Sequence, residues 1–222
     1  RVRWLYAYKA GNTDRLPSLR DNFAAIARRV NAVVYNSSMA SGNKPQKVRF
    51  ATTPECSLRN AAVAIKGDIT NFGNIKSQLR AAGYDRYDRK YIVMVDAAGG
   101  CGIGDLYGSD TNSPTNRNNS GNMFAAIWRP CWNYAEPHEL GHMLGAVQDT
   151  SPHSTAGHHC NDDNDVMCYD DGTARSTMTN PCTAAIKNWM YDCGFNDYYD
   201  RGAETPYVST HWNIAENQYL TN

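Results

Sequence analysis

The chain carries the pattern H-E-x-x-H at His138, Glu139 and His142. On an α-helix, side chains four positions apart lie on the same face, so the two imidazoles can bind one metal ion. The carboxylate beside them can accept a proton from a water molecule that the ion activates. This spacing of residue types therefore predicts a zinc centre that hydrolyses peptide bonds.

Further residues follow this pattern at informative positions. Gly145 comes three residues after His142, where a glycine favours the end of the helix because it readily adopts positive φ. Met167 and Tyr169 follow downstream. With these residues the chain resembles the metzincin clan of zinc endopeptidases. The resemblance implies that Met167 forms a methionine-containing turn beneath the metal, and that Tyr169 stabilises the transition state as in astacin-like and serralysin-like members.

The third metal ligand is the point at which this chain departs from the clan. Metzincins usually place a histidine, or an aspartate in snapalysin-like members, three residues after the glycine, and this chain has Gln148 there. An amide oxygen is a weak zinc ligand. Asp149 is chemically suitable but stands one residue out of register.

A histidine-rich loop over residues 150–159 offers better ligands. His159 precedes the methionine by eight residues, a separation similar to that in matrix-metalloproteinase-like members. The resemblance therefore implies that His138, His142 and His159 bind the zinc. The alternatives are His153, His158, Asp149 and Gln148.

These residues predict a reaction. Zinc held by three protein ligands keeps an open position for water and lowers the pKa of that water to about 7. Glu139 then acts as general base and passes the proton to the leaving amine, while Tyr169 can donate a hydrogen bond to the developing oxyanion. We predict a secreted zinc metalloendopeptidase. A binding or toxin-like protein on the zincin fold and a hydrolase of non-peptide amides are the alternatives.

Length and charge set the broad class. The 222 residues, of which 41% are hydrophobic, suit one catalytic domain. The resemblance implies an upper part over residues 1–145, which includes the zinc helix, and a lower part over residues 146–222. The formal net charge is zero, with 22 basic and 22 acidic residues, so nothing indicates a nucleic acid or a membrane as partner. We expect a monomer.

Seven cysteines predict an oxidising compartment and hence secretion. Cys56 is left over when the others are paired locally, and is either buried and free or paired with a segment outside this chain. The chain begins at Arg1 without a methionine or a hydrophobic leader, so we expect a processed form. The local disulfides we predict are Cys101–Cys131, Cys160–Cys168 and Cys182–Cys193.

Hydrophobic patterning predicts an α+β fold with a twisted mixed sheet. Besides the zinc helix, it favours strands over residues 2–9, 46–52, 91–95 and 123–128, and helices over residues 16–34, 74–82 and 184–191. The resemblance implies that the strand 123–128 is the edge strand above the cleft. A protein or peptide substrate would add to this edge as a further extended strand.

Acidic residues gather at three places in the loops and could bind calcium, which takes oxygen ligands. No EF-hand spacing is present, and ordinary Asp and Asn turns are the alternative. The groups are Asp105 and Asp110; Asp162, Asp163 and Asp165; and Asp170 and Asp171.

Overall fold

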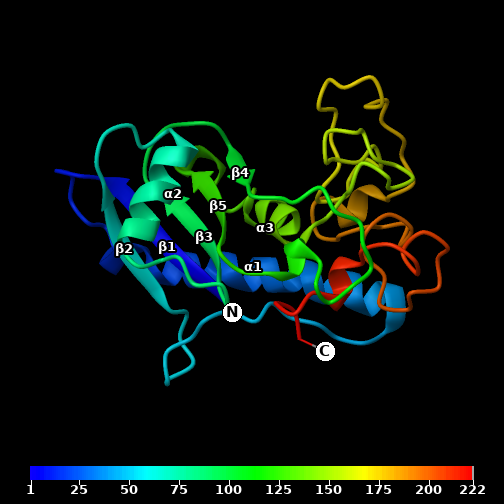
Figure 1. Ribbon diagram of the computed structural model, residues 1–222, viewed down its shortest axis with the longest axis horizontal. Helices are drawn as coiled ribbons and strands as arrows, with labels where there is room; N and C mark the ends of the chain where they lie inside the picture. Colours follow the sequence, from blue (N-terminus) through cyan, green and yellow to red (C-terminus); the bar gives the residue numbers. More distant parts are fainter. Residues whose placement is uncertain (222) are drawn as a thin grey trace. The chain divides into compact units, whose positions relative to one another are not determined.

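The protein contains one mixed sheet, seen here in a computed structural model that describes residues 1–221, with only the backbone at Ile186 (Figure 1). The strand order is β2-β1-β3-β5-β4. Neighbouring strands are parallel except β4, which is antiparallel to β5. The strands are β1 (Val2–Lys9), β2 (Asn60–Ile65), β3 (Lys90–Val95), β4 (Gly102–Gly104) and β5 (Met123–Trp128).

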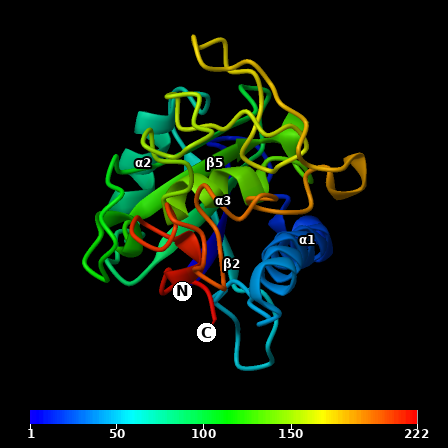
Figure 2. The ribbon, with the colours of Figure 1, turned by 90° about the vertical axis from the view of Figure 1, so that its right-hand side faces the viewer.

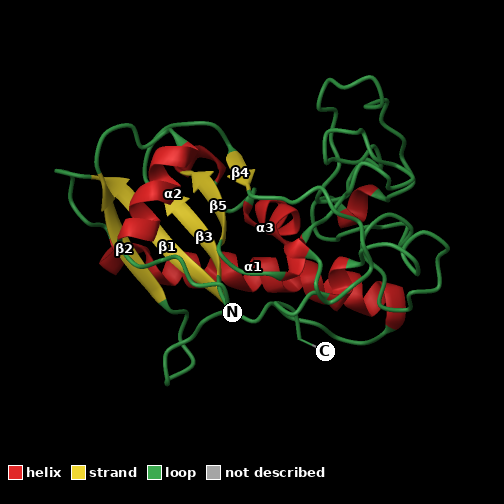
Figure 3. Ribbon diagram, viewed as in Figure 1, coloured by secondary structure: helices red, strands yellow, loops and turns green. Residues whose placement is uncertain are grey.

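Three α-helices accompany the sheet, and short 3₁₀ turns occur in the loops (Figure 3). The helices are α1 (Leu16–Gly42), α2 (Phe72–Ala81) and α3 (Glu136–Leu144). The 3₁₀ turns are η1 (Arg117–Asn119), η2 (Arg129–Cys131), η3 (Ala184–Ile186) and η4 (Ile214–Glu216). No helix in residues 1–221 has the length and apolar character needed to cross a membrane.

Contacts divide the chain into two compact units. The first unit holds the sheet, α2, the first half of α1 and most of α3. It comprises Arg1–Val30, Arg49–Asp105 and Ser120–Met143. The second unit comprises Asn31–Val48, Leu106–Asn119 and Leu144–Asn222.

In the first unit, alternation along the strands separates two apolar faces. Successive strand residues point to opposite faces, so Leu5 and Ala7 of β1 pack on one side and Trp4 and Tyr6 on the other. The first face is covered by α2, and the second contacts Phe23 of α1, whose ring centroid lies 6.2 Å from Trp4 and 6.1 Å from Tyr6. Figure 2 shows α2 and the first turns of α1 on different sides of the strands.

The second unit has little regular structure beyond the end of α1, and polar contacts and disulfides fix its loops. The Tyr199 hydroxyl donates to Gln46 Oε1 at 2.7 Å, and the Tyr191 amide donates to Ser37 Oγ at 2.8 Å. Both tyrosines are buried. Two of the disulfides, Cys160–Cys168 and Cys182–Cys193, lie in this unit, and the third, Cys101–Cys131, lies in the first.

Most predicted elements are confirmed. The α+β class, the mixed sheet, the strands at residues 2–9, 91–95 and 123–128, the helices near residues 16–34 and 74–82, and the three disulfides are all present. The first helix extends further than predicted, to Gly42, because buried Ser37 and Ser38 continue its buried face beyond residue 34. Cys56 is free, as one alternative held, but it is exposed rather than buried.

Three predictions are wrong. Residues 46–52 form isolated bridges rather than a strand, and β2 is Asn60–Ile65, whose half-exposed side chains gave a weaker hydrophobic signal. Residues 184–191 contain only the turn η3 instead of a helix. The strand 123–128 is not the edge: β5 lies between β3 and β4, and all its residues are buried, so β4 forms that edge.

A substitution at Phe124 of β5 tests how much the sheet face covered by α2 contributes to stability. Its ring is fully buried and stacks on Tyr91 with centroids 4.9 Å apart. We expect Phe124→Ala to lower the free energy of unfolding by about 3–5 kcal/mol, since it removes buried area and leaves a cavity. Urea denaturation followed by tryptophan fluorescence measures the loss. Tyr35→Ala, at a side chain that is 43% exposed on α1, should cost less than about 1 kcal/mol.

Candidate metal centre

Local interactions explain why α3 forms where it does. The Glu139 amide donates to the Ala135 carbonyl at 2.9 Å, and Pro137 stands in the first turn, where its missing N–H group is not needed. Glu136 Oε1 accepts a hydrogen bond from the Asn133 amide at 2.9 Å, which fixes the chain at the start of the helix. Leu140 and Met143 are fully buried on the opposite face from the histidines.

His138 and His142 lie one turn apart on α3, as the spacing predicted. Their Nε2 atoms are 3.1 Å apart, and their ring planes make an angle of 85°. Two neutral imidazoles can satisfy this contact only if one nitrogen carries a proton and the other accepts it. Two imidazole nitrogens that face each other in this way also suit a shared metal ion.

Glu139 lies beside these histidines and is only 5% exposed. Burial raises the pKa of Glu139 to about 8, because a charged carboxylate loses hydration there. Two glycines of β4 leave room for the side chain: a Cβ atom at Gly102 would meet the Glu139 carboxyl, and one at Gly104 would lie 2.8 Å from the Glu139 carbonyl oxygen. The carboxyl group is therefore enclosed between α3 and the glycines of β4.

The C-terminal end of α3 is fixed by contacts in the second unit. Gly145 has a φ of 93°, as predicted, and a Cβ there would approach Asn118 and Trp212 to 2.7 Å. The last carbonyl of the helix, on Leu144, accepts hydrogen bonds from Trp212 Nε1 at 2.8 Å and Asn217 Nδ2 at 3.2 Å. The Leu144 carbonyl thereby has hydrogen-bond donors although no further helical turn follows it.

His159, in the second unit, has both ring nitrogens in contact with side chains. Its Nδ1 lies 3.0 Å from Asp171 Oδ2, which also accepts the Thr155 hydroxyl at 2.6 Å. Burial opposes the charged form of Asp171, but the bonds from Thr155, His159 and Thr173 outweigh burial and lower its pKa. A charged Asp171 therefore accepts a hydrogen bond from Nδ1–H and fixes the tautomer in which Nε2 carries no proton.

Tyr169 lies against the other side of this imidazole. Its hydroxyl is 3.1 Å from His159 Nε2, and the two ring centroids are 4.3 Å apart. The side chain is 46% exposed, so it can rotate without a large loss of packing. The tyrosine hydroxyl thus lies at the nitrogen that a metal ion would require.

Met167, the predicted turn methionine, is fully buried. Its amide donates to Asp165 Oδ1 at 2.7 Å, and the Tyr198 hydroxyl donates to the same oxygen at 2.6 Å. The disulfide between Cys160 and Cys168 closes the loop that leads from His159 to this turn.

The alternative ligands have other partners. Gln148 is buried and donates to the Gly145 carbonyl at 3.0 Å. Asp149 lies 3.2 Å from His158, and His153 Nδ1 lies 2.8 Å from Asp197. Gln148 therefore contacts the end of the helix through its amide nitrogen.

Among the described residues, three groups of side chains could hold a metal ion. The group of Cys160, Asp165 and Cys168 is unsuitable because its two cysteines form a disulfide. The other two groups are His138, His142 and His159, and His153, Asp162 and Asp197.

The acidic residues expected to bind calcium have separate partners. Asp105 lies 2.6 Å from Lys76 Nζ, and Asp110 accepts the Thr150 hydroxyl at 2.7 Å. Asp165 holds the methionine turn and Asp171 holds His159. Asp162 belongs to the group with His153, which contains a nitrogen donor.

Sequence reasoning missed the positioning role of Asp171 and the two glycines of β4. Asp171 follows His159 by twelve residues, a separation without a helical or strand period, so nothing in the sequence paired the two. Gly102 and Gly104 form a G-x-G pattern, and two alternate glycines in a short strand can signal a close approach to another element.

No protein-family model matches the sequence, and no curated protein matches it. A solved structure described as a chaperone–substrate complex is similar over 68% of this chain, with 20% sequence identity and a TM-score of 0.31. The chain spans 24% of the length of that protein, and likeness at this level carries no argument about fold or function.

Asp165 tests how the methionine turn is held. Asp165→Ala removes the acceptor of the Met167 amide and the Tyr198 hydroxyl, two donors that stay buried. We expect the free energy of unfolding to fall by about 3 kcal/mol, since each buried donor without a partner costs about 1–3 kcal/mol. Chemical denaturation measures this change. Asp163→Ala, at a less buried neighbour, should cost less than about 1 kcal/mol, and equal losses would contradict the assignment.

Proposed function

We propose that this protein is a zinc-dependent endopeptidase. The observation that carries the proposal is the arrangement on α3, where two imidazole nitrogens 3.1 Å apart stand beside a buried glutamate. A helix that buries a carboxyl group next to two facing imidazoles serves no evident packing purpose, because apolar residues would fill the same place at lower cost. Metal-assisted hydrolysis needs this combination.

His159 supplies the third ligand in this proposal. Its Nδ1 is engaged by Asp171, which leaves Nε2 to bind the ion, and a carboxylate behind a metal-binding histidine is the usual means of orienting it. His138, His142 and His159 are three neutral nitrogen donors, a set that zinc accepts in catalytic sites. Tyr169 must then release Nε2, and almost half of its side chain is exposed to solvent.

The reaction follows from the positions of these side chains. A zinc ion, when bound, supplies Lewis acidity that polarises the peptide carbonyl and lowers the pKa of water. Glu139 accepts the proton of the attacking water and delivers it to the leaving amine. The positive charge of a nearby cation favours the ionised carboxylate and so counters the effect of burial on its pKa. Tyr169, once released from His159, donates a hydrogen bond from its hydroxyl group to the developing oxyanion.

The substrate in this proposal is an extended peptide that pairs with β4. This strand is the edge of the sheet beside β5, so its outer backbone groups have no strand neighbour within the described sheet. Gly102 and Gly104 of the same strand pack on Glu139. A peptide added to β4 would therefore run past the general base, and the scissile bond would be positioned by backbone hydrogen bonds.

The three disulfides support action in an oxidising compartment, and we include secretion in the proposal. A binding protein that keeps this fold without proteolysis would not require Glu139 to stay beside the histidines. A hydrolase of non-peptide amides would use the same residues on another substrate, and the assay below separates it from a peptidase.

Glu139→Gln tests the general base. This substitution keeps the shape of the side chain but removes its ability to accept a proton, so casein cleavage should fall by at least about a hundredfold while zinc binding persists. Cleavage assays and metal analysis on the same samples measure both properties. Glu136→Gln is the matched control, because Glu136 is also buried on α3 but bonds to the Asn133 amide.

Two outcomes would count against the proposal. Retention of most of the activity in Glu139→Gln would remove Glu139 from the mechanism. A lack of casein cleavage by the zinc-loaded wild type would point to binding or to a non-peptide substrate instead.

Asp171→Asn tests the third ligand. An amide can present its NH₂ group to Nδ1 and so favours the wrong tautomer of His159, which should lower zinc affinity about 10–100-fold. Competition with a chromogenic chelator measures the affinity. The control is Asp170→Asn at the exposed neighbour, which bonds to the Gly172 amide and should leave affinity unchanged. If Asp171→Asn also binds zinc as tightly as the wild type, His159 is not oriented as proposed.

A further inference from the structure

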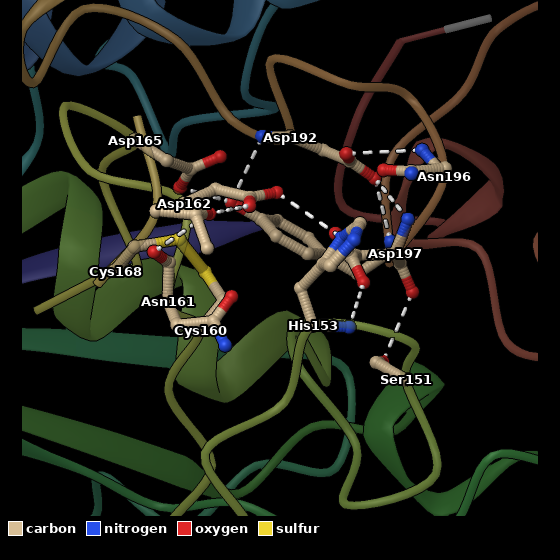
Figure 4. Close-up of polar contacts among 12 residues, drawn as sticks. Ser151, His153, Cys160, Asn161, Asp162, Asp165, Cys168, Asp192, Asn196 and Asp197 are labelled. Atoms are coloured by element: carbon tan, nitrogen blue, oxygen red, sulfur yellow. Dashed lines mark hydrogen bonds and ion pairs between the residues drawn. A yellow bond between two sulfur atoms is a disulfide. The ribbon is translucent and has the colours of Figure 1, made fainter. Parts of the chain in front are cut away.

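A second polar cluster lies wholly within the second unit and takes no part in the mechanism above. It consists of His153, Asp162 and Asp197, which come from three separate loop segments (Figure 4). His153 Nδ1 lies 2.8 Å from Asp197 Oδ2 and 3.2 Å from Asp162 Oδ2. One ring nitrogen, with at most one proton, therefore faces two carboxylate oxygens. We call these three residues the His153 cluster.

The two carboxylates are buried and short of positive charge. The side chains of Asp162 and Asp197 are only 5% and 2% exposed. Within residues 1–221, His153 is the only side chain that can form an ion pair with either carboxylate, and no lysine or arginine lies within reach of them. Even a protonated imidazole would leave one negative charge uncompensated, and an uncompensated buried charge is costly.

The neighbours of the cluster do not relieve this charge. Asp192, a third buried carboxylate, accepts backbone hydrogen bonds from residues 196–199, so those amides are not available to the cluster. Asn161 and Asn196, the residues that precede Asp162 and Asp197, each have a buried side-chain oxygen with no hydrogen-bond partner. Figure 4 shows Asn196 next to Asp192 and Asp197. The hydrogen bonds near the two carboxylates therefore supply no positive charge, whereas a bound cation would.

We propose that His153, Asp162 and Asp197 bind a divalent cation of the zinc class, at a site distinct from the α3 histidines. The imidazole releases its Nδ1 proton to solvent, and the freed lone pair and the two carboxylates become the ligands. A nitrogen donor favours zinc and related transition metals over calcium, which takes oxygen ligands. The ion would neutralise the two carboxylates that burial otherwise disfavours.

The ion would also join loops that have no regular structure of their own. Asp197 Oδ1 accepts the His153 amide at 2.8 Å, and the Ser151 hydroxyl donates to the Asp197 carbonyl at 3.0 Å. These bonds already bring residues 151–153 to residue 197. A metal ion would add Asp162 to this junction, so we infer a stabilising role.

Metal stoichiometry tests this site. Each full-length variant is equilibrated with Zn²⁺ and freed of excess ion, and its bound zinc is then measured. The His153→Ala variant should contain about one zinc ion per chain fewer than the wild type. His158→Ala, the matched control from the same loop, should contain as much zinc as the wild type. The difference should persist in a His142→Ala background, in which binding at α3 is impaired. This second background separates the site from the proposed catalytic ion. Zn²⁺ should raise the melting temperature of His142→Ala more than that of His142→Ala/His153→Ala.

Folding of each variant is checked by far-ultraviolet circular dichroism. If His153→Ala does not fold, Asp162→Asn gives the same test, because its amide oxygen can still accept the Thr179 hydroxyl, which donates to Asp162 Oδ1 at 3.0 Å. Equal zinc content in wild type and folded cluster variants would overturn the proposal. Binding of Ca²⁺ but not Zn²⁺ at the cluster would also overturn it, since the imidazole would then not be a ligand.

Discussion

Two imidazole nitrogens that face each other at 3.1 Å impose the main constraint on this structure. They are satisfied only by a shared proton or by a shared cation, and they keep this geometry only if α3 remains a regular helix. The features around α3 serve this requirement. Fully buried Leu140 and Met143 set its rotation, and the glycines of β4 leave space for the carboxyl group beside the histidines. The N–H groups of Trp212 and Asn217 that donate to the Leu144 carbonyl fix where the helix stops.

The sequence alone predicted those helices and strands that are each determined by one periodic pattern of apolar residues. The alternation in β1, the apolar run of β3 and the helical spacing in α1 and α2 each correspond to an element of the structure. The same holds for α3, since the pattern H-E-x-x-H fixes both the element and the mutual position of its side chains. The helix end at Gly145 was predictable for a related reason, because glycine is the residue type that adopts a positive φ most readily.

The remaining errors have physical causes. β2 has half-exposed small residues, so its pairing with β1 is visible only once the sheet exists. The family resemblance implied that β5 is the edge strand, and the sequence did not reveal β4 as the true edge. β4 has only three residues, two of them glycine, and a strand so short has no periodicity to detect. The roles of Asp171 and of the His153 cluster depend on loops whose course is set by disulfides and polar contacts rather than by hydrophobic pattern.

The disulfide Cys160–Cys168 begins one residue after His159 and ends one residue after Met167. The covalent link therefore encloses the path between a candidate ligand and the buried turn, and it forms only where thiols are oxidised. A newly made chain in a reducing environment has every histidine of the candidate centre but lacks this closure. The arrangement of His159 is thus coupled to the redox state of the surroundings in which the chain folds.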